Sequence, residues 1–418
     1  MVLIMSPAII YSSAAVFLFS AISLVVSSGY SGGAVLLSLA GIGLLFRRAS
    51  WPKLERRDWI ILLLFLVYFL TWAGEVWLDG QSSSRLDKPS RIVLAALALF
   101  WLLKYPPRAS AFWGGIAAGA IMVGLWAGWQ KLFEGVDRAG GFTHMIQFGN
   151  ISMLLGMLSL TGLGWAMTQK RKVLWFIVLL AGMLGGMGGS LFSGSRGGWI
   201  GIPFVLLVLA HAYADLVGRR RIAIVAVLVV LLGTVFYFHP ATGVQSRVQA
   251  AVSDVDRFFN EGVVNTSVGA RFEMWRSGAF AFKESPIWGM GTNGFRVYRD
   301  TLIDAGKVDP LLADYGHLHN EYIDTAAKRG LIGLLALLAL YLVPLKMFTR
   351  MLGERLENRQ PYAAAGAVLC VSYMDYGLSQ TFLSHNSGVM VFFFMMAIIW
   401  SLVRSSETGT AQTQPRSR

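Results

Sequence analysis

Apolar residues fall in long runs that alternate with short polar connections along most of the chain. A helix needs roughly 17–25 predominantly apolar residues to cross a bilayer, and twelve runs approach or reach this length. They cover residues 7–27, 32–46, 58–74, 91–104, 112–131, 146–168, 173–190, 198–217, 222–238, 320–347, 362–382 and 387–403. The pattern predicts an all-α polytopic membrane protein with about twelve transmembrane helices.

The composition supports this class and excludes others. Of the 418 residues, 55% are hydrophobic and only 14% are charged, whereas ordinary soluble domains carry roughly 25% charged residues. The single cysteine, Cys370, excludes an intramolecular disulfide and a cysteine-rich metal site. A net charge of +13 would suggest nucleic-acid binding in a soluble protein, but here the basic residues follow the alternation of the connections, so we expect no nucleic-acid partner.

Basic residues are distributed unequally between the two sets of alternating connections. One set, which includes the C-terminal tail, carries 20 Lys and Arg residues, and the short connections of the other set carry 6. Because positive charge holds connections in the cytoplasm, we expect both termini to be cytoplasmic. The first apolar run is not followed by a small-residue cleavage site, so we interpret it as a retained helix.

One connection, residues 239–318, is much longer than the others, and the alternation places it outside the membrane. Apolar residues recur at helical spacing in three parts of it, at 244–259, 272–282 and 295–302. This predicts three short amphipathic helices on the outer face of the membrane.

The expected organisation has four parts. Transmembrane helices occupy residues 1–238 and 319–404, and the loop domain occupies residues 239–318 between them. The polar tail at 405–418 has the composition of a disordered segment.

The segment 316–322, with the sequence GHLHNEY, directly precedes a very apolar run. If a helix begins near Leu318, His319 stands at the outer interface, and Gly330 and Gly333 lie on the same helix face. A histidine above a groove of small residues is a candidate general base. The alternative is that the histidine only caps or hydrogen-bonds a loop, while the small residues let a neighbouring helix pack closely. A metal site is disfavoured, because His317 and His319 diverge by about 200° on a helix.

Arginines on the expected outer side are candidates for binding phosphate oxygens. Arg196 lies in a glycine- and serine-rich turn, SGSRGGW at 193–199, and Arg271 lies at the start of a loop helix. Arg138 and Arg296 are weaker cases of the same kind. The alternatives are an interfacial arginine that snorkels to the membrane surface and an exposed charge that pairs with a neighbour.

Other chemistries find little support. Asp254 and Asp256 match a D-x-D metal pattern, but they fall on the polar side of an amphipathic helix, which favours a solvated face over a divalent-cation site. The chain has no phosphate-binding P-loop, no dinucleotide-binding glycine fingerprint and no G-x-S-x-G nucleophile elbow. ATP-driven transport and serine hydrolysis are therefore poorly supported, and we expect no metal and no cofactor.

With these residues in view, the chain resembles the bacterial O-antigen ligase family, in the group that also contains O-antigen polymerases and O-linked oligosaccharyltransferases. Family ligases carry a histidine followed by Asn, Ser or Gln, then nine residues, then G-x-x-[GTY]. The chain has His319-Asn320, nine residues, then Gly330 and Gly333. Family ligases also carry R-x-x-x-L on an outer loop. This chain has Arg196 at the first position of that motif and Ile200 in place of the leucine.

The resemblance implies a GT-C-like glycosyltransferase of the bacterial inner membrane. It would transfer O-antigen polysaccharide from an undecaprenyl diphosphate donor to the lipid A-core acceptor on the periplasmic side. Membrane lipids would be further partners, and the reaction would need no metal ion. His319 would be the base, and Arg196 and Arg271 would bind the diphosphate, with Arg138 and Arg296 as lesser candidates. A single displacement would invert the anomeric centre. The expected acceptor or lipid groove comprises Asn320, Tyr322, Gly330 and Gly333.

Three other functions stay open. An O-antigen polymerase would move the glycan onto a second lipid diphosphate, and an O-linked oligosaccharyltransferase would need a protein acceptor. A flippase or transporter is less favoured, because transporters place polar sites near the midplane on internally repeated helices. Here the conspicuous residues gather at one expected face, and no repeat is evident.

Overall fold

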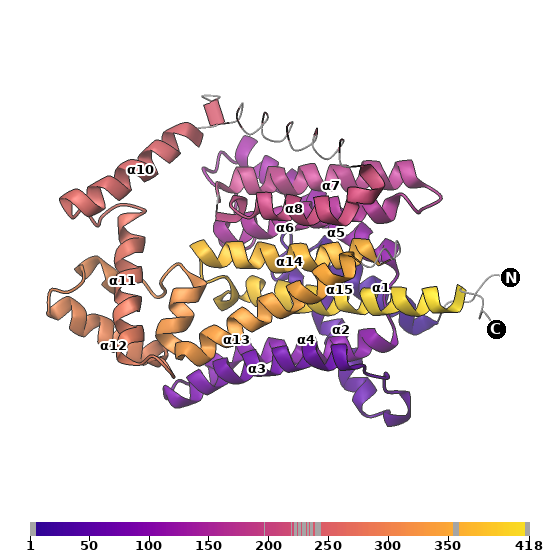
Figure 1. Ribbon diagram of the computed structural model, residues 1–418, viewed down its shortest axis with the longest axis horizontal. Helices are drawn as coiled ribbons and strands as arrows, with labels where there is room; N and C mark the ends of the chain where they lie inside the picture. The colour runs from indigo at the N-terminus through magenta and orange to yellow at the C-terminus, as the bar shows by residue number, and fades with distance from the viewer. Residues whose placement is uncertain are drawn as a thin grey trace. The chain divides into compact units, whose positions relative to one another are not determined.

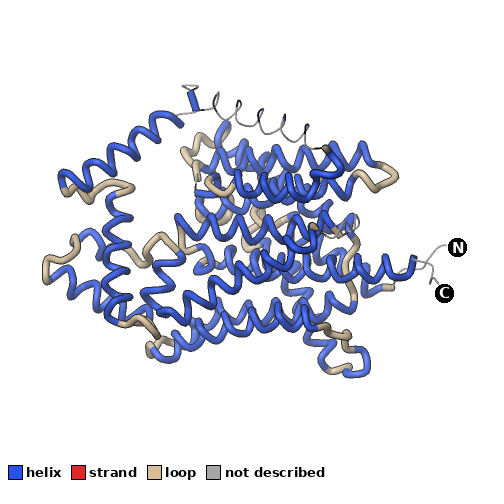
Figure 2. Tube along the Cα trace, viewed as in Figure 1, coloured by secondary structure: helices blue, strands red, loops and turns tan. Residues whose placement is uncertain are grey.

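The computed structural model describes residues 6–195, 197–218, 244–353 and 359–413, together with scattered positions between 220 and 238. Within these ranges the chain forms helices and connecting loops and no strand (Figure 2). It divides into two compact units. Unit 1 comprises Met1–Ala73, Ser83–Ala212 and Ala336–Arg418, and unit 2 comprises Gly74–Ser82 and Tyr213–Leu335. The expected all-α class is confirmed.

Unit 1 is a bundle of long apolar helices (Figure 1). It contains α1 (Pro7–Ala21), α2 (Gly29–Leu45), most of α3 (Arg56–Leu78), α4 (Asp87–Lys104), α5 (Ala109–Leu132), α6 (Met145–Ala166), α7 (Lys172–Ser193), most of α8 (Ile202–Val217), the second part of α13 (Glu321–Leu352), α14 (Gln360–Ser379) and α15 (Asn386–Thr413). Helices α6 and α7 pack along each other, as do α1 and α5, and α4 and α15. Helices α6 and α15 form the interior, because 83% and 94% of their most apolar windows are buried.

Seven helices in the described ranges are long and apolar enough to cross a membrane. Every expected apolar range outside 222–238 coincides with a helix of the structure, and residues 222–238 lie largely outside the described residues. The helix positions are thus confirmed, while the total of twelve spans stays a prediction.

Unit 2 contains the three helices expected in the long connection, α10 (Val244–Glu261), α11 (Gly269–Glu284) and α12 (Gly291–Asp304), and the first part of α13 (Glu321–Leu352). The apolar faces of α11 and α12 meet in a small core that includes Met274, Phe295, Leu302 and Leu318, whereas Val252 and Phe259 of α10 are exposed. The spacing of apolar residues therefore predicted these helices correctly. Their position on a membrane face stays a prediction.

The end of α3 is part of unit 2. The Asp79 carboxylate accepts the backbone N–H groups of Asn293 (2.7 Å) and Gly294 (3.0 Å), and so caps the N-terminus of α12. One turn earlier, the buried Glu75 carboxylate pairs with Arg329 of α13 at 3.1 Å and accepts the Thr292 hydroxyl at 2.6 Å. Two carboxylates at the C-terminal end of α3, one of them just after its last residue, therefore hold α12 and α13 in place.

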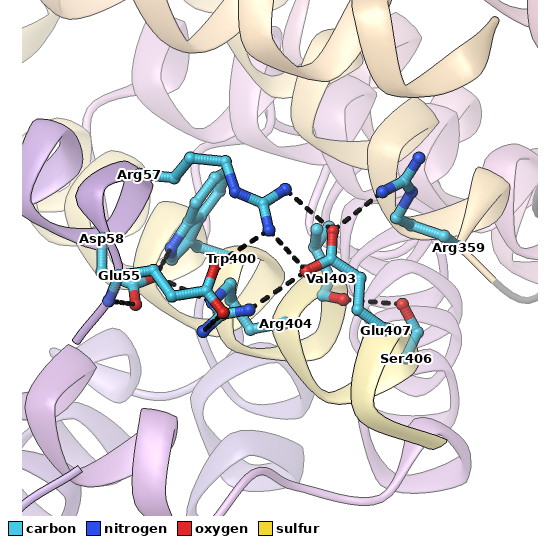
Figure 3. Close-up of polar contacts among 9 residues, drawn as sticks. All are labelled: Glu55, Arg57, Asp58, Arg359, Trp400, Val403, Arg404, Ser406 and Glu407. Carbon is cyan, nitrogen blue, oxygen red and sulfur yellow. Dashed lines mark hydrogen bonds and ion pairs between the residues drawn. The ribbon is translucent and has the colours of Figure 1, made fainter. Parts of the chain in front are cut away.

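An ionic cluster at one end of unit 1 joins the starts of α3 and α14 to the end of α15 (Figure 3). The Glu407 carboxylate accepts hydrogen bonds from Arg57 (2.9 and 2.8 Å), Arg359 (2.8 Å) and Arg404 (3.1 Å). Arg404 also binds the fully buried Asp58 at 3.0 Å. These bonds hold the end of α15, which continues past its apolar part to Thr413. The disordered cytoplasmic tail at 405–418 stays a prediction.

We expect Glu407→Gln to lower the free energy of unfolding by about 1–3 kcal/mol, between the values for exposed and fully buried ion pairs. The substitution keeps the size of the side chain but leaves three guanidinium groups with one carboxylate fewer. Denaturant unfolding of the purified protein measures the effect. The control is Glu261→Gln, which removes an exposed pair with Arg257 at 3.6 Å and should cost less than about 1 kcal/mol.

Candidate active site

His319 lies two residues before the first residue of α13 and has a left-handed backbone conformation, with φ of 48°. Among the described residues, Ser28 is the only other non-glycine residue with a positive φ. Such a conformation costs about 1–3 kcal/mol and persists where the surrounding structure fixes it, often at functional sites. The environment of His319 is therefore the first place to look for chemistry.

Both neighbours of His319 are anchored. The Leu318 carbonyl accepts the Trp275 indole N–H at 3.1 Å, and the Leu318 N–H donates to the Asp324 carboxylate at 3.1 Å. On the other side, the Asn320 side-chain oxygen accepts the N–H groups of Tyr322 and Ile323, both at 3.0 Å. Asn320 is thus the N-cap of α13. The chain is fixed before and after His319, so its imidazole is presented from a rigid backbone.

Arg299 fixes the beginning of the same segment. Its guanidinium donates to the Tyr315 carbonyl at 2.8 Å and pairs with Asp300 at 2.8 Å. Sequence reasoning singled out Arg296, one turn earlier on α12, which is exposed. Only the buried arginine of this helix reaches the histidine segment, and no local sequence signal separates the two.

His317 and His319 lie together. Their ring centroids are 4.2 Å apart, and the His319 N–H donates to His317 Nδ1 at 3.4 Å. The expected divergence of 200° is wrong, because α13 begins at Glu321 and neither histidine is helical. His317 is therefore a neighbour of the candidate base.

Gly330 interrupts α13 with φ of 61° and ψ of −159°, a conformation that is essentially restricted to glycine. The connection between α11 and α12 docks into this break. The Leu331 N–H donates to the Pro286 carbonyl at 2.8 Å, and the Met290 N–H donates to the Ala327 carbonyl at 3.0 Å. The backbone groups released by the break are thereby satisfied.

The helical wheel that placed Gly330 and Gly333 below His319 is therefore wrong. A Cβ atom on Gly330 would meet the main chain of Ile287 and Gly289, and one on Gly333 would meet the Arg329 side chain of the same helix. The assignment of Asn320, Tyr322, Gly330 and Gly333 to an acceptor or lipid groove stays a prediction, and the structure adds a packing role for Gly330 and a capping role for Asn320.

Gly330→Ala should destabilise unit 2 by more than about 2 kcal/mol, because the new Cβ would meet the Ile287 carbonyl in a backbone conformation that alanine avoids. Thermal unfolding of the purified protein measures this loss. The matched control is Gly294→Ala in α12, whose nearest Cβ contact would be an ordinary 3.6 Å from Met290. Equal stability of the two variants would contradict the docked break.

Arg271 lies in the first turn of α11, one turn before Trp275 on the same face. Trp275 binds the carbonyl next to His319, so Arg271 and the histidine segment belong to one neighbourhood of unit 2. The guanidinium is half-buried, and burial lowers its pKa from the usual value. Within the described ranges no carboxylate or other acceptor binds it. A partly desolvated cation without a counter-ion is costly, which favours an anionic ligand here.

Unit 1 contains the other two arginine candidates. Arg196 lies outside the described residues. Arg138 binds the turn just before residue 196, because its Nε atom donates to the Ser193 carbonyl at 2.9 Å. On the same turn, the Ser195 hydroxyl donates to the buried Asn150 side chain at 3.0 Å. The pairing of Arg138 with this turn was not foreseen from the sequence.

The glycines after Arg196 allow close packing. A Cβ atom at Gly198 would lie 2.8 Å from the Tyr376 ring, and one at Gly201 would lie 2.7 Å from the Asp375 carboxylate, both on α14. The glycine-rich composition that suggested a phosphate cradle is therefore also required by helix packing.

The described residues contain no group of three or more His, Cys, Asp or Glu side chains placed to hold a metal ion. In the D-x-D pattern, the Asp256 carboxylate accepts the Asn260 side-chain amide at 2.7 Å, one turn along α10. This contact fits the solvated face that the sequence favoured at Asp254 and Asp256.

Comparisons with known proteins point to one family. Residues 183–338 match a family model described as O-antigen ligase. This range contains Arg196, Arg271, Arg296 and His319, and it leaves Arg138 outside.

Two curated proteins are similar to the chain. An uncharacterized protein of Haemophilus influenzae is 29% identical over 384 residues, which cover 91% of this chain and 95% of the relative. An O-antigen ligase of Escherichia coli is 23% identical over 223 residues, which cover 51% of this chain and 48% of that ligase.

Proposed function

We propose that the chain is a glycosyltransferase acting on a lipid-linked glycan, because residues 183–338 match the O-antigen ligase family model and contain the motifs at His319 and Arg196. The specific proposal is an O-antigen ligase that transfers polysaccharide from undecaprenyl diphosphate to the lipid A-core. The chain's apolar helices and the family match support a multi-pass membrane protein, and the distribution of basic residues supports periplasmic chemistry in the bacterial inner membrane.

The observation that carries the proposal is His319, held in a left-handed conformation by its anchored neighbours. In the proposed reaction, an acceptor sugar hydroxyl attacks the anomeric carbon of the donor, and the bond from that carbon to the diphosphate oxygen breaks. The imidazole takes the hydroxyl proton, because histidine is the side chain that most often acts as a general base near neutral pH. A single displacement of this kind inverts the anomeric centre.

The leaving diphosphate gains negative charge as the bond breaks, and a fixed cation stabilises it. Arg271 fits this role, because it is partly desolvated, has no counter-ion among the described residues and lies one turn from Trp275. Arg196, Arg138 and Arg296 are further candidates for the same ligand. The proposed mechanism uses no metal ion.

The test is reconstitution with purified protein, an undecaprenyl-diphosphate-linked O-polysaccharide and lipid A-core. Formation of lipid A-core that carries polysaccharide is the expected result. In cells, deletion should leave lipid A-core without O-antigen while polymer is still made on its lipid carrier. Loss of the polymer itself would indicate a polymerase instead.

A further inference from the structure

Unit 2 contains an open pocket of about 500 Å³ that is separate from the His319 segment. Its walls come from the end of α10, the side of α11 and the loop 306–310 after α12. Phe258 and Phe259 form one wall, with their ring centroids 5.3 Å apart, and both rings pack on Phe272 of α11. Phe259 is 70% exposed, so an aromatic surface is left open to a ligand.

The remaining lining of the pocket includes charged side chains that hydrogen bonds and an ion pair hold in place. The Glu273 carboxylate, which is 3% exposed, accepts the Asp309 N–H at 3.0 Å and pairs with Arg276 at 3.5 Å. The Asp309 carboxylate accepts the Leu311 N–H at 2.8 Å. Lys307 completes the charged lining. The groups therefore present donors and acceptors from defined positions.

The balance of charge narrows the class of ligand. The lining contains two carboxylates, Glu273 and Asp309, and two cations, Arg276 and Lys307, so its charge selects neither a diphosphate nor a divalent cation. Four charged groups likewise disfavour a lipid chain. A sugar ring fits both walls, because it presents C–H groups to an aromatic face and hydroxyl groups to charged donors and acceptors at its edge.

We propose that this pocket is a glycan subsite, in which Phe258 and Phe259 stack on sugar rings of the polysaccharide while Lys307 and the Glu273–Arg276 pair bind their hydroxyl groups. A volume of about 500 Å³ is within the usual range for small-molecule sites. The inference rests on the proposed function, since it assigns the pocket to the saccharide part of that reaction's substrates. It gives unit 2 a binding role besides the chemistry at His319.

Direct binding tests the subsite without requiring catalysis. Purified full-length protein is titrated with lipid-free O-polysaccharide, released by mild acid from the source bacterium's lipopolysaccharide, and binding is followed by saturation-transfer NMR. We expect Phe259→Ala to weaken binding about 5-fold or more, and Lys307→Met to weaken it at least about 2-fold. Inorganic pyrophosphate should not compete with the polysaccharide.

The matched control is Trp288→Ala, which removes an exposed aromatic ring of the same unit that does not line the pocket. It should bind the polysaccharide as the unaltered protein does. Unchanged binding in Phe259→Ala, or displacement of the polysaccharide by pyrophosphate, overturns the subsite.

A parallel transfer assay separates this inference from the proposed function. If the unaltered protein binds polysaccharide through Phe259 but forms no transfer product, the subsite stands and the ligase proposal fails. If it transfers glycan normally and Phe259→Ala does not change binding, the ligase proposal stands and the subsite fails.

Discussion

Replacing His319 with alanine should lower the rate of glycan transfer by about 10²–10⁴-fold, the usual loss when a general base is removed. The acceptor hydroxyl would keep its proton as it attacks the anomeric carbon. Donor binding should change little, because the base acts on the acceptor. The measurement is kcat with purified protein and saturating donor, together with donor binding measured separately.

A second histidine provides the matched control. His385 also precedes a long helix and is also followed by asparagine, but it stacks on His144 in unit 1, with ring centroids 6.4 Å apart. His385→Ala should retain most of the transfer rate. If His319→Ala turns over normally, the proposed base is wrong. If both variants lose activity equally, the effect is structural and His319 loses its special role.

Replacing Arg271 with alanine should reduce kcat/KM for the lipid diphosphate donor roughly 10–100-fold, as expected for a lost hydrogen bond between charged groups. Arg271→Lys should recover only part of the loss, because an ammonium group is a point charge and cannot bind two phosphate oxygens in a fork. Steady-state kinetics with varied donor concentration measure both effects.

The control for Arg271 is Arg257→Ala on α10, which removes an exposed cation paired with Glu261 and should leave donor use unchanged. The same experiment should be run in EDTA, in which the reaction should continue if fixed arginines stabilise the leaving group. Activity that disappears in EDTA and returns with magnesium would contradict the arginine model and restore Asp254 and Asp256 as candidate metal ligands.

The helices could be predicted from the sequence because the length of an apolar run and the spacing of apolar residues are local properties. Even α10, α11 and α12 in the long connection were found in this way. The surroundings of His319 were not, since the prediction extended α13 backwards past its true start. Asparagine is a preferred N-cap, so Asn320 already offered a signal that the helix begins at Glu321.

Other parts of the site depend on residues far apart in the chain. Nothing near Gly330 in the sequence shows that the loop after α11 docks there, although a glycine inside an apolar helix pattern is a warning of a break. The bond from Trp275 to Leu318 and the bond from Arg299 to Tyr315 join segments 43 and 16 residues apart. Their partners become evident only when the chain is folded.

The carboxylates at the end of α3 have a consequence for how the protein is made. Residues 183–338, which match the family model, include α12 and Arg329 but exclude Glu75 and Asp79. A fragment cut at the edges of the match would therefore lack the cap of α12 and the partner of Arg329. During synthesis, domains generally fold from the N-terminus, so α3 is complete more than 200 residues before α12 emerges. The earlier helix can then serve as a preformed attachment point for the loop.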